Sequence, residues 1–328
     1  MIVASVGIRV PSRPMRPSSI ALSLCLALAC TAKSEPTPEP SKPADEVIEV
    51  AARQAPKVAV IDAGTEPRRT LVLHPSAGST EKLELRTDMR ISMDQGAGAS
   101  PMMTMPTAVT RMASTIEQVD GGFFSVAQGV ESVEVLAAPG IDAKVVAQMR
   151  ASMDPLVRYK AVLRMDERGV VRGGTVTIPG DAQPLVKTTM LQLSENLGQL
   201  SVPLPAEPVG IGARWTSESH VEQGGMKLRQ DAAYTLAALE GEHVVIEASL
   251  VQSLEDPTIT PPGMFGATAH VGEFASSGKG RLELDLDHLT PSAVTLDLDL
   301  HMKMEMKVLG QEQRIGMDMG ITLAMTRP

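Results

Sequence analysis

The strongest constraint on the fold is a strict alternation of apolar and polar residues in the C-terminal third of the chain. Between residues 296 and 307 every second residue is Leu or Met, and the residues between them are charged or polar. Residues 282–287 alternate in the same way. Because side chains of a β-strand point to opposite faces in turn, this pattern predicts strands with one apolar and one charged face. With His288–Pro291 as the turn, the two segments predict a long antiparallel hairpin, and a further strand begins near Met317.

Weaker alternation extends this interpretation to the rest of the chain. Helices are predicted from Asp142 to Asp154 and from Pro184 to Gly198. We expect a mainly β (α+β) fold, with long antiparallel strands in a curved sheet or half-barrel packed against one or two helices. A repeated order of elements adds the hypothesis of an internal duplication, with halves at 57–200 and 201–328. The additional predicted strands are Leu83–Met93, Val109–Val119, Phe123–Val135, Arg158–Met165, Val170–Ile178, Met226–Leu239 and Val244–Leu254.

The first 29 residues have the three parts of an export signal. Arginines without acidic residues come first, an apolar stretch from Ile20 to Leu28 follows, and the small residue Ala29 precedes a cysteine. The apolar stretch has about ten residues, whereas a helix that spans a bilayer needs about twenty. We therefore predict that residues 1–29 are a signal peptide, with either Met1 or Met15 as the true start.

The segment Leu26–Cys30 resembles the lipobox of bacterial lipoproteins, in which the cysteine is diacylated. The resemblance implies that Cys30 is lipidated and anchors the protein to a membrane. Ala27 departs from the pattern, because leucine is commonest three residues before the cysteine, so cleavage as an ordinary secreted protein stays open. Thr31 stands beside the cysteine in place of Asp, which by resemblance favours the outer membrane, facing the periplasm or the cell surface.

Residues 30–56 are predicted to form a tether that follows the anchor. Four prolines stand among Ser, Thr, Glu and Lys between Thr31 and Pro43. This composition favours an extended polyproline conformation over a packed core, with a reach of roughly 40 Å at ~3.1 Å per residue. The β-rich globular region is then expected at 57–328.

Cysteine use and charge restrict the partners of the chain. Cys25 leaves with the signal and a lipidated Cys30 cannot pair, so we expect a fold without disulfides. The full chain has 30 basic and 39 acidic side chains, and removal of three signal-peptide arginines leaves a mature net charge of −12. Because a basic footprint is absent, we predict no nucleic-acid partner.

Two short segments resemble segments of uncharacterised bacterial lipoproteins of the myxobacterial type. They are Ala63–Arg69 and Pro203–Trp215, the second with the sequence PLPAEPVGIGARW. The resemblance spans most of the mature chain, and its motifs are structural. It implies a lipoprotein of the cell envelope, and it brings no known activity, ligand or catalytic residue.

No residue set has the spacing of a catalytic site. The six histidines lack zinc-site spacing, no G-x-S-x-G elbow occurs, and the one mature cysteine is used by the lipid. We therefore predict a protein without enzymatic activity or cofactor, with carboxylate pairs as the one route by which catalysis stays open. Four aspartates of the alternating strands lack the glycine of a calcium loop and are expected on a solvated sheet face. They are Asp285, Asp287, Asp297 and Asp299.

Methionine is abundant, with 20 residues, while aromatic residues make up 2% of the chain. In the strands, Met continues the Leu series and is expected to fill the core. Met102, Met103 and Met105 lie instead in a Pro/Gly-rich loop. Since thioethers select Cu(I), these three residues are our candidates for copper binding.

The apolar face of the long strands is the expected functional surface. By analogy with lipoprotein carriers, a concave Leu/Met face is expected to hold an acyl chain or another apolar small molecule. The alternative is a structural or interaction module with a filled core that contacts envelope proteins. The insertion Asp256–Ser277 is expected either to cover an apolar cavity or to tuck into the edge of the fold. A cavity on the order of several hundred Å³ would favour carriage, and a close-packed interior would favour the module.

Overall fold

The computed structural model describes residues 44–52, 54–94, 98–182, 186–187, 190–191, 202–223, 225–259, 268–308 and 311–328. These residues form a single antiparallel sheet of 15 strands. The strands that precede residue 200 are β1 (Glu46–Val50), β2 (Lys57–Asp62), β3 (Thr80–Asp94), β4 (Met103–Thr104), β5 (Thr107–Asp120), β6 (Phe123–Leu136), β7 (Lys160–Asp166) and β8 (Val171–Ile178). The later strands are β9 (Arg214–Gln223), β10 (Met226–Glu240), β11 (His243–Leu254), β12 (Thr258–Ile259), β13 (Ala269–Asp285), β14 (Ala293–Val308) and β15 (Gln311–Thr326).

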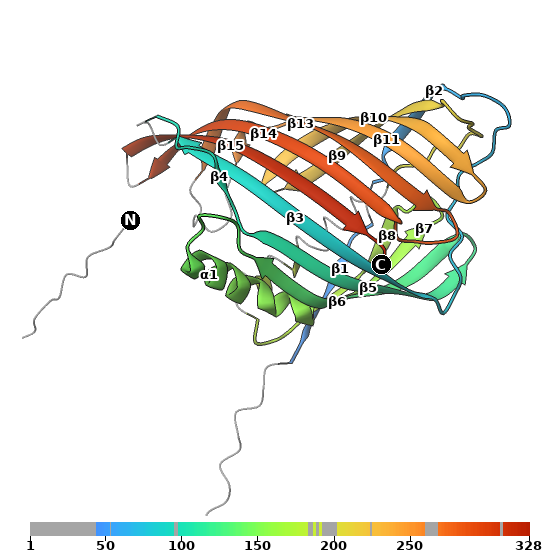
Figure 1. The fold of residues 1–328 in the computed structure, drawn as a ribbon, viewed down its shortest axis with the longest axis horizontal. Coiled ribbons are helices and arrows are strands. Elements are labelled where there is room, and N and C mark those ends of the chain that lie inside the picture. The colour runs from blue at the N-terminus through green and yellow to red at the C-terminus, as the bar shows by residue number, and fades with distance from the viewer. Residues whose placement is uncertain are drawn as a thin grey trace, which may run out of the picture. The chain divides into compact units, whose positions relative to one another are not determined.

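The strand order confirms the predicted mainly β fold. It runs β1-β8-β7-β6-β5-β3-β15-β14-β13-β11-β10-β9-β2, with β4 paired to β3 and β12 paired to β13. Two antiparallel meanders, β3 to β8 and β9 to β15, join where β15 pairs with β3. The sheet curls but does not close, because β1 and β2 form its two ends (Figure 1).

The two meanders share one order of elements. In the first, the hairpin β5–β6 is separated from the hairpin β7–β8 by a helix, and in the second, β10–β11 is separated from β13–β14 by β12. This recurrence agrees with the element order on which the duplication hypothesis rests. The two halves are not separate in the sheet, because β2 of the N-terminal half pairs with β9 of the C-terminal half.

One face of the sheet, here called the inner face, carries the hydrophobic core. A first cluster joins buried residues from both meanders, including Val176 of β8, Leu83 of β3 and Trp215 of β9. The indole of Trp215 is fully buried, stacks on Tyr234 with 5.5 Å between ring centroids, and donates a hydrogen bond of 3.0 Å to the carbonyl of Pro203. A smaller second cluster contains Met302 and other residues near the opposite ends of the strands. Methionine therefore fills part of the core, as predicted.

The predicted first helix is α1 (Ala143–Met153), which packs along β6 and is followed by the 3-10 helix η1 (Asp154–Arg158) (Figure 1). The carboxylate of Asp142 caps α1 by accepting the N–H of Lys144 at 2.8 Å. No residue of α1 is fully buried, so the helix lies on the surface beside β6 and does not form a central layer. Of the second predicted helix, 186–187 and 190–191 have helical backbone, and its other residues lie outside the described part of the chain.

The predicted boundary between the tether and the globular region is wrong. Residues 46–50, assigned to the tether, form β1 and pair with β8 from Glu46↔Ile178 to Val50↔Gly174. This short strand pairs with the edge of β8 that would otherwise stay open. A Pro-rich composition does not predict such a pairing. The insertion Asp256–Ser277 is also more regular than expected, because β13 begins at Ala269 and β12 pairs with it. Ile259 of β12 is buried in the second cluster, which favours tucking into the fold, while Pro261–Phe265 lie outside the described residues.

Candidate functional site

The inner face of the sheet remains partly uncovered between its two core clusters. Apolar side chains of β14, β15 and β3 are only partly buried there, and they belong to neither cluster. Their register makes them neighbours, since Leu298 lies opposite Ile321 and Ile321 lies opposite Met89. At ~4.8 Å between strands, the patch is about 10 Å across. We call it the central strip, and it consists of Leu296, Leu298, Met319, Ile321, Leu323, Met89 and Ile91.

Charge is nearly absent from this face. In the described parts of β3, β9, β10, β11, β13, β14 and β15, Glu81 is the one charged side chain at an inward position. The charged residues of these strands alternate onto the outer face, where Asp297, Asp299 and Lys303 lie. A ligand on the central strip would therefore meet an apolar surface without a counter-ion.

The apolar cavity beside the first core is small. A cavity of about 80 Å³ lies among Leu83, Met112, Leu204, Leu284 and Met325, with Ser114 and Gln128 in its polar wall. The Nε2 atom of Gln128 lies 3.3 Å from Ser114 Oγ, while its buried Oε1 atom has no hydrogen-bond partner among the described residues. Since a water takes about 30 Å³, this cavity suits a few waters and not a lipid. Among these described residues, the cavity beside the first core is therefore too small for a lipid.

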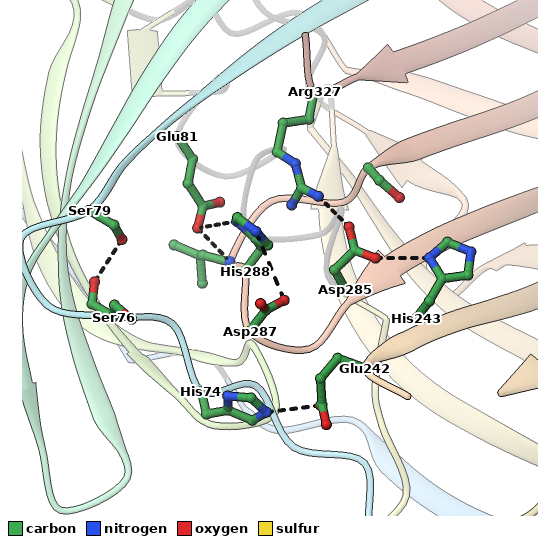
Figure 2. Close-up of polar contacts among 12 residues, drawn as sticks. His74, Ser76, Ser79, Glu81, Glu242, His243, Asp285, Asp287, His288 and Arg327 are labelled. Atoms are coloured by element: carbon green, nitrogen blue, oxygen red, sulfur yellow. Dashed lines mark hydrogen bonds and ion pairs between the residues drawn. The ribbon is translucent and has the colours of Figure 1, made fainter. Parts of the chain in front are cut away.

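Next to the cavity, the buried carboxylate of Glu81 organises the turn between β13 and β14 (Figure 2). One oxygen accepts the N–H of Thr290 at 2.7 Å and its hydroxyl at 2.6 Å, and the other accepts the N–H of Leu289 at 3.0 Å. His288 Nδ1 approaches the same carboxylate at 3.4 Å. With its side chain 4% exposed, Glu81 is committed to holding this turn.

Around this turn, two further carboxylates pair with histidines (Figure 2). Asp285 accepts from His243 at 2.8 Å and also pairs with Arg327. Burial opposes ionisation of Asp285, but the bonds from His243 and Arg327 outweigh it and hold the pKa of Asp285 below its ordinary value. Glu242 lies 3.0 Å from His74, and this hydrogen bond lowers the pKa of Glu242. These contacts tie the C-terminal end of β15 and the β10–β11 turn to the rest of the sheet.

The wide hollows of the structure have mixed, partly charged linings. One of about 770 Å³ is lined by Glu49, Arg164 and Arg172, among others, near β1, β7 and β8. Another of about 700 Å³ is lined by Arg90, His301 and Asp318, among others. In the second, Asp318 accepts from His301 at 2.6 Å and raises the pKa of that imidazole. The first lining suits contact with water better than with an apolar ligand, whereas the second combines its charged groups with apolar residues such as Leu300 and Met319.

The sequence-predicted site residues fall in two places. Cys30 lies outside the described residues, so its lipidation stays a prediction. Met102 and Met103 are 52% and 51% exposed, and Met103 lies in β4. Consecutive residues of extended backbone point to opposite sides, so Met103 and Met105 are the pair that can converge on one Cu(I) ion. In the described part of the chain, no group of three or more His, Cys, Asp or Glu is arranged to hold a metal.

The histidines are less isolated than the sequence indicates. Five of the six contact a carboxylate, and the partner is distant in sequence in most cases; these five are His74, His220, His243, His288 and His301. Of the four aspartates expected on a solvated face, Asp285 is the exception, because its side chain is only 23% exposed. The buried carboxylate of Glu81 was not predicted from the sequence either. The available signal was a polar residue at an inward position of an alternating strand.

No protein-family model matches the chain, and no curated protein matches it in sequence. The two segments that resemble envelope lipoproteins contact each other, with Thr65 N donating to Ile211 O and Arg69 N to Val209 O at 3.0 Å each. Their contact agrees with a structural role for both motifs. Among the described residues, no helix is long and apolar enough to cross a bilayer.

Proposed function

We propose that this protein is a lipid-anchored protein of the cell envelope that binds an apolar ligand on the central strip, without catalysing a reaction on it. The observation that carries the proposal is the partly uncovered apolar surface between the two core clusters, on a face almost free of charge. The segment Leu26–Cys30, which resembles a lipobox, supplies the anchor, and Thr31 beside it favours the outer membrane by resemblance.

The energetics of such a surface suit a reversible ligand. Each methylene taken out of water contributes ~0.8 kcal/mol. About ten methylenes therefore supply ~8 kcal/mol, from which the cost of association is subtracted. We expect affinities no tighter than roughly micromolar for a single acyl chain. Such binding matches a carrier or sensor that must release its ligand.

A second candidate is an interaction or structural module with a filled core. The small size of the cavity beside the first core, about 80 Å³, favours this alternative at that end of the sheet. Under it, the central strip would contact an envelope protein.

Binding of the neutral fluorophore N-phenyl-1-naphthylamine tests the proposal. The test uses the mature chain with Cys30→Ser, which lacks the predicted lipid and so needs no detergent. We expect saturable binding of the fluorophore, and Ile321→Asp should weaken this binding at least tenfold. Val251→Asp is the matched control, since Val251 is an apolar strand residue that is 58% exposed on the outer face. Equal binding by both variants, or none by the parent protein, would reject the central strip as a ligand site.

A further inference from the structure

A row of polar side chains crosses the inner face beside the central strip. Gln230 of β10 lies opposite both Ser219 of β9 and Gln252 of β11, and Gln252 lies opposite Ser276 of β13. The same row continues through residues 300, 319 and 91 of β14, β15 and β3, all of them apolar. At ~4.8 Å per strand, the polar part spans roughly 14 Å and adjoins the apolar part directly. The row is therefore amphipathic along the direction that crosses the strands.

The hydrogen bonds within this row leave some of its N–H donors unused. Ser276 Oγ donates to Gln252 Oε1 at 2.8 Å, and Gln252 Nε2 donates to Gln230 Oε1 at 3.0 Å. Each amide oxygen thus already accepts one hydrogen bond. Within the described part of the chain, Gln230 Nε2 donates to no acceptor, although Gln230 is only partly buried and faces inward. A molecule that contacts the row gains most if it brings a hydrogen-bond acceptor.

No cationic side chain lies at an inward position of the described strands named above, and this limits which acceptor group a ligand can bring. A carboxylate or phosphate on this face would lose its water without gaining a cation, and burial of an uncompensated charge is costly. Glu81 provides no counter-charge, because it is itself acidic and is held by Thr290. A neutral carbonyl oxygen needs only the amide N–H groups that the row presents.

We propose that the polar row binds the ester carbonyl of an uncharged acyl lipid whose chain lies on the central strip. This inference rests on the proposed function and specifies its ligand. The polar and apolar parts of the row place a carbonyl at Gln230 and Gln252 and a hydrocarbon chain over Met319 and Ile91 of the central strip in one continuous contact.

Competition against bound N-phenyl-1-naphthylamine tests the assignment, using the mature chain with Cys30→Ser. The competitors are methyl oleate, a neutral ester, 1-octadecene, which lacks oxygen, and oleate, which is charged. One neutral hydrogen bond is worth about 1 kcal/mol, so methyl oleate should compete about fivefold better than 1-octadecene. It should also compete better than oleate.

Substitution of the row separates the possible outcomes. In the double variant Gln230→Leu and Gln252→Leu the preference for the ester should vanish while fluorophore binding persists. If the double variant unfolds, the single variant Gln230→Met replaces it in the same test. Gln148→Leu on the exposed surface of α1 is the matched control and should keep the preference. Equal competition by the ester and the alkene, or a preference that survives the double variant, would overturn the ester assignment and leave apolar binding intact. Failure of the parent protein to bind the fluorophore would overturn both proposals.

Discussion

Gly210 lies so close to Thr65 that a Cβ atom on Gly210 would sit 1.8 Å from the carbonyl oxygen of Thr65. The Gly210 N–H also donates to Ala63 O at 2.9 Å, so the two segments approach backbone to backbone. Real Cβ atoms do not come this near to backbone oxygen, and any side chain at 210 must push the segments apart. The glycine is thus required for the close packing of segments 63–69 and 203–215.

Gly210→Ala should therefore destabilise the fold by about 2–3 kcal/mol, the upper range for overpacking. The free energy of unfolding from urea titration measures it. Gly272→Ala is the matched control, because a Cβ atom there meets nothing within 4 Å. A similar stability for both variants would show that the two segments can separate at little cost.

Glu81→Gln should destabilise the turn between β13 and β14. The amide keeps one acceptor oxygen and turns its NH₂ toward backbone N–H groups that Glu81 now satisfies. A buried unsatisfied donor costs about 1–3 kcal/mol, so we expect a loss of that size in thermal or urea unfolding. Glu222→Gln, at an exposed carboxylate of β9, should change stability by less than about 0.5 kcal/mol. Equal effects would contradict the structural role of Glu81.

Asp285 should make stability fall in acid. Its folded pKa lies below the ordinary value of 3.8, so the ionised group stabilises the fold above that pH, and the stabilisation disappears as the pH falls through the folded pKa. Asp285→Asn should cost about 1–2 kcal/mol at pH 7 and show a shallower fall between about pH 4 and pH 2. Urea unfolding at several pH values measures both slopes. Parallel slopes would mean that Asp285 is not the titrating group.

Cys30→Ser should move the protein from the membrane fraction to the soluble fraction, and the mature mass should lose its acyl groups. Mass spectrometry and fractionation measure the two effects. Cys25→Ser is the control, because we expect Cys25 to be removed with the predicted signal peptide. Unchanged mass and retention in the Cys30 variant would overturn the lipid anchor.

The long strands were predictable because each buries one face, and burial of one face imposes the period of two. The hairpin around His288–Pro291 is confirmed, with β14 spanning Ala293–Val308. Besides the two-residue strands β4 and β12, the sequence did not reveal β1, β2 and β9. β1 and β2 are short and lie at the ends of the sheet, and β9 carries Ser217 and Ser219 at inward positions, which breaks the apolar series.

The candidate site was harder to predict than the fold. An apolar inner face follows from the alternation of Leu296 to Met306, but which part of it stays uncovered depends on packing between distant segments. The polar row depends on register. Gln230, Gln252 and Ser276 are far apart in sequence, and only the pairing of β10, β11 and β13 makes them neighbours.

Native mass spectrometry of the mature Cys30→Ser chain, purified from the envelope compartment without detergent, tests the ligand claim most directly. We predict a noncovalent adduct with the mass of an uncharged acyl lipid, retained in Val251→Asp and lost in Ile321→Asp. A spectrum with only the mass of the free protein, or an adduct equally present in both variants, would contradict binding on the central strip.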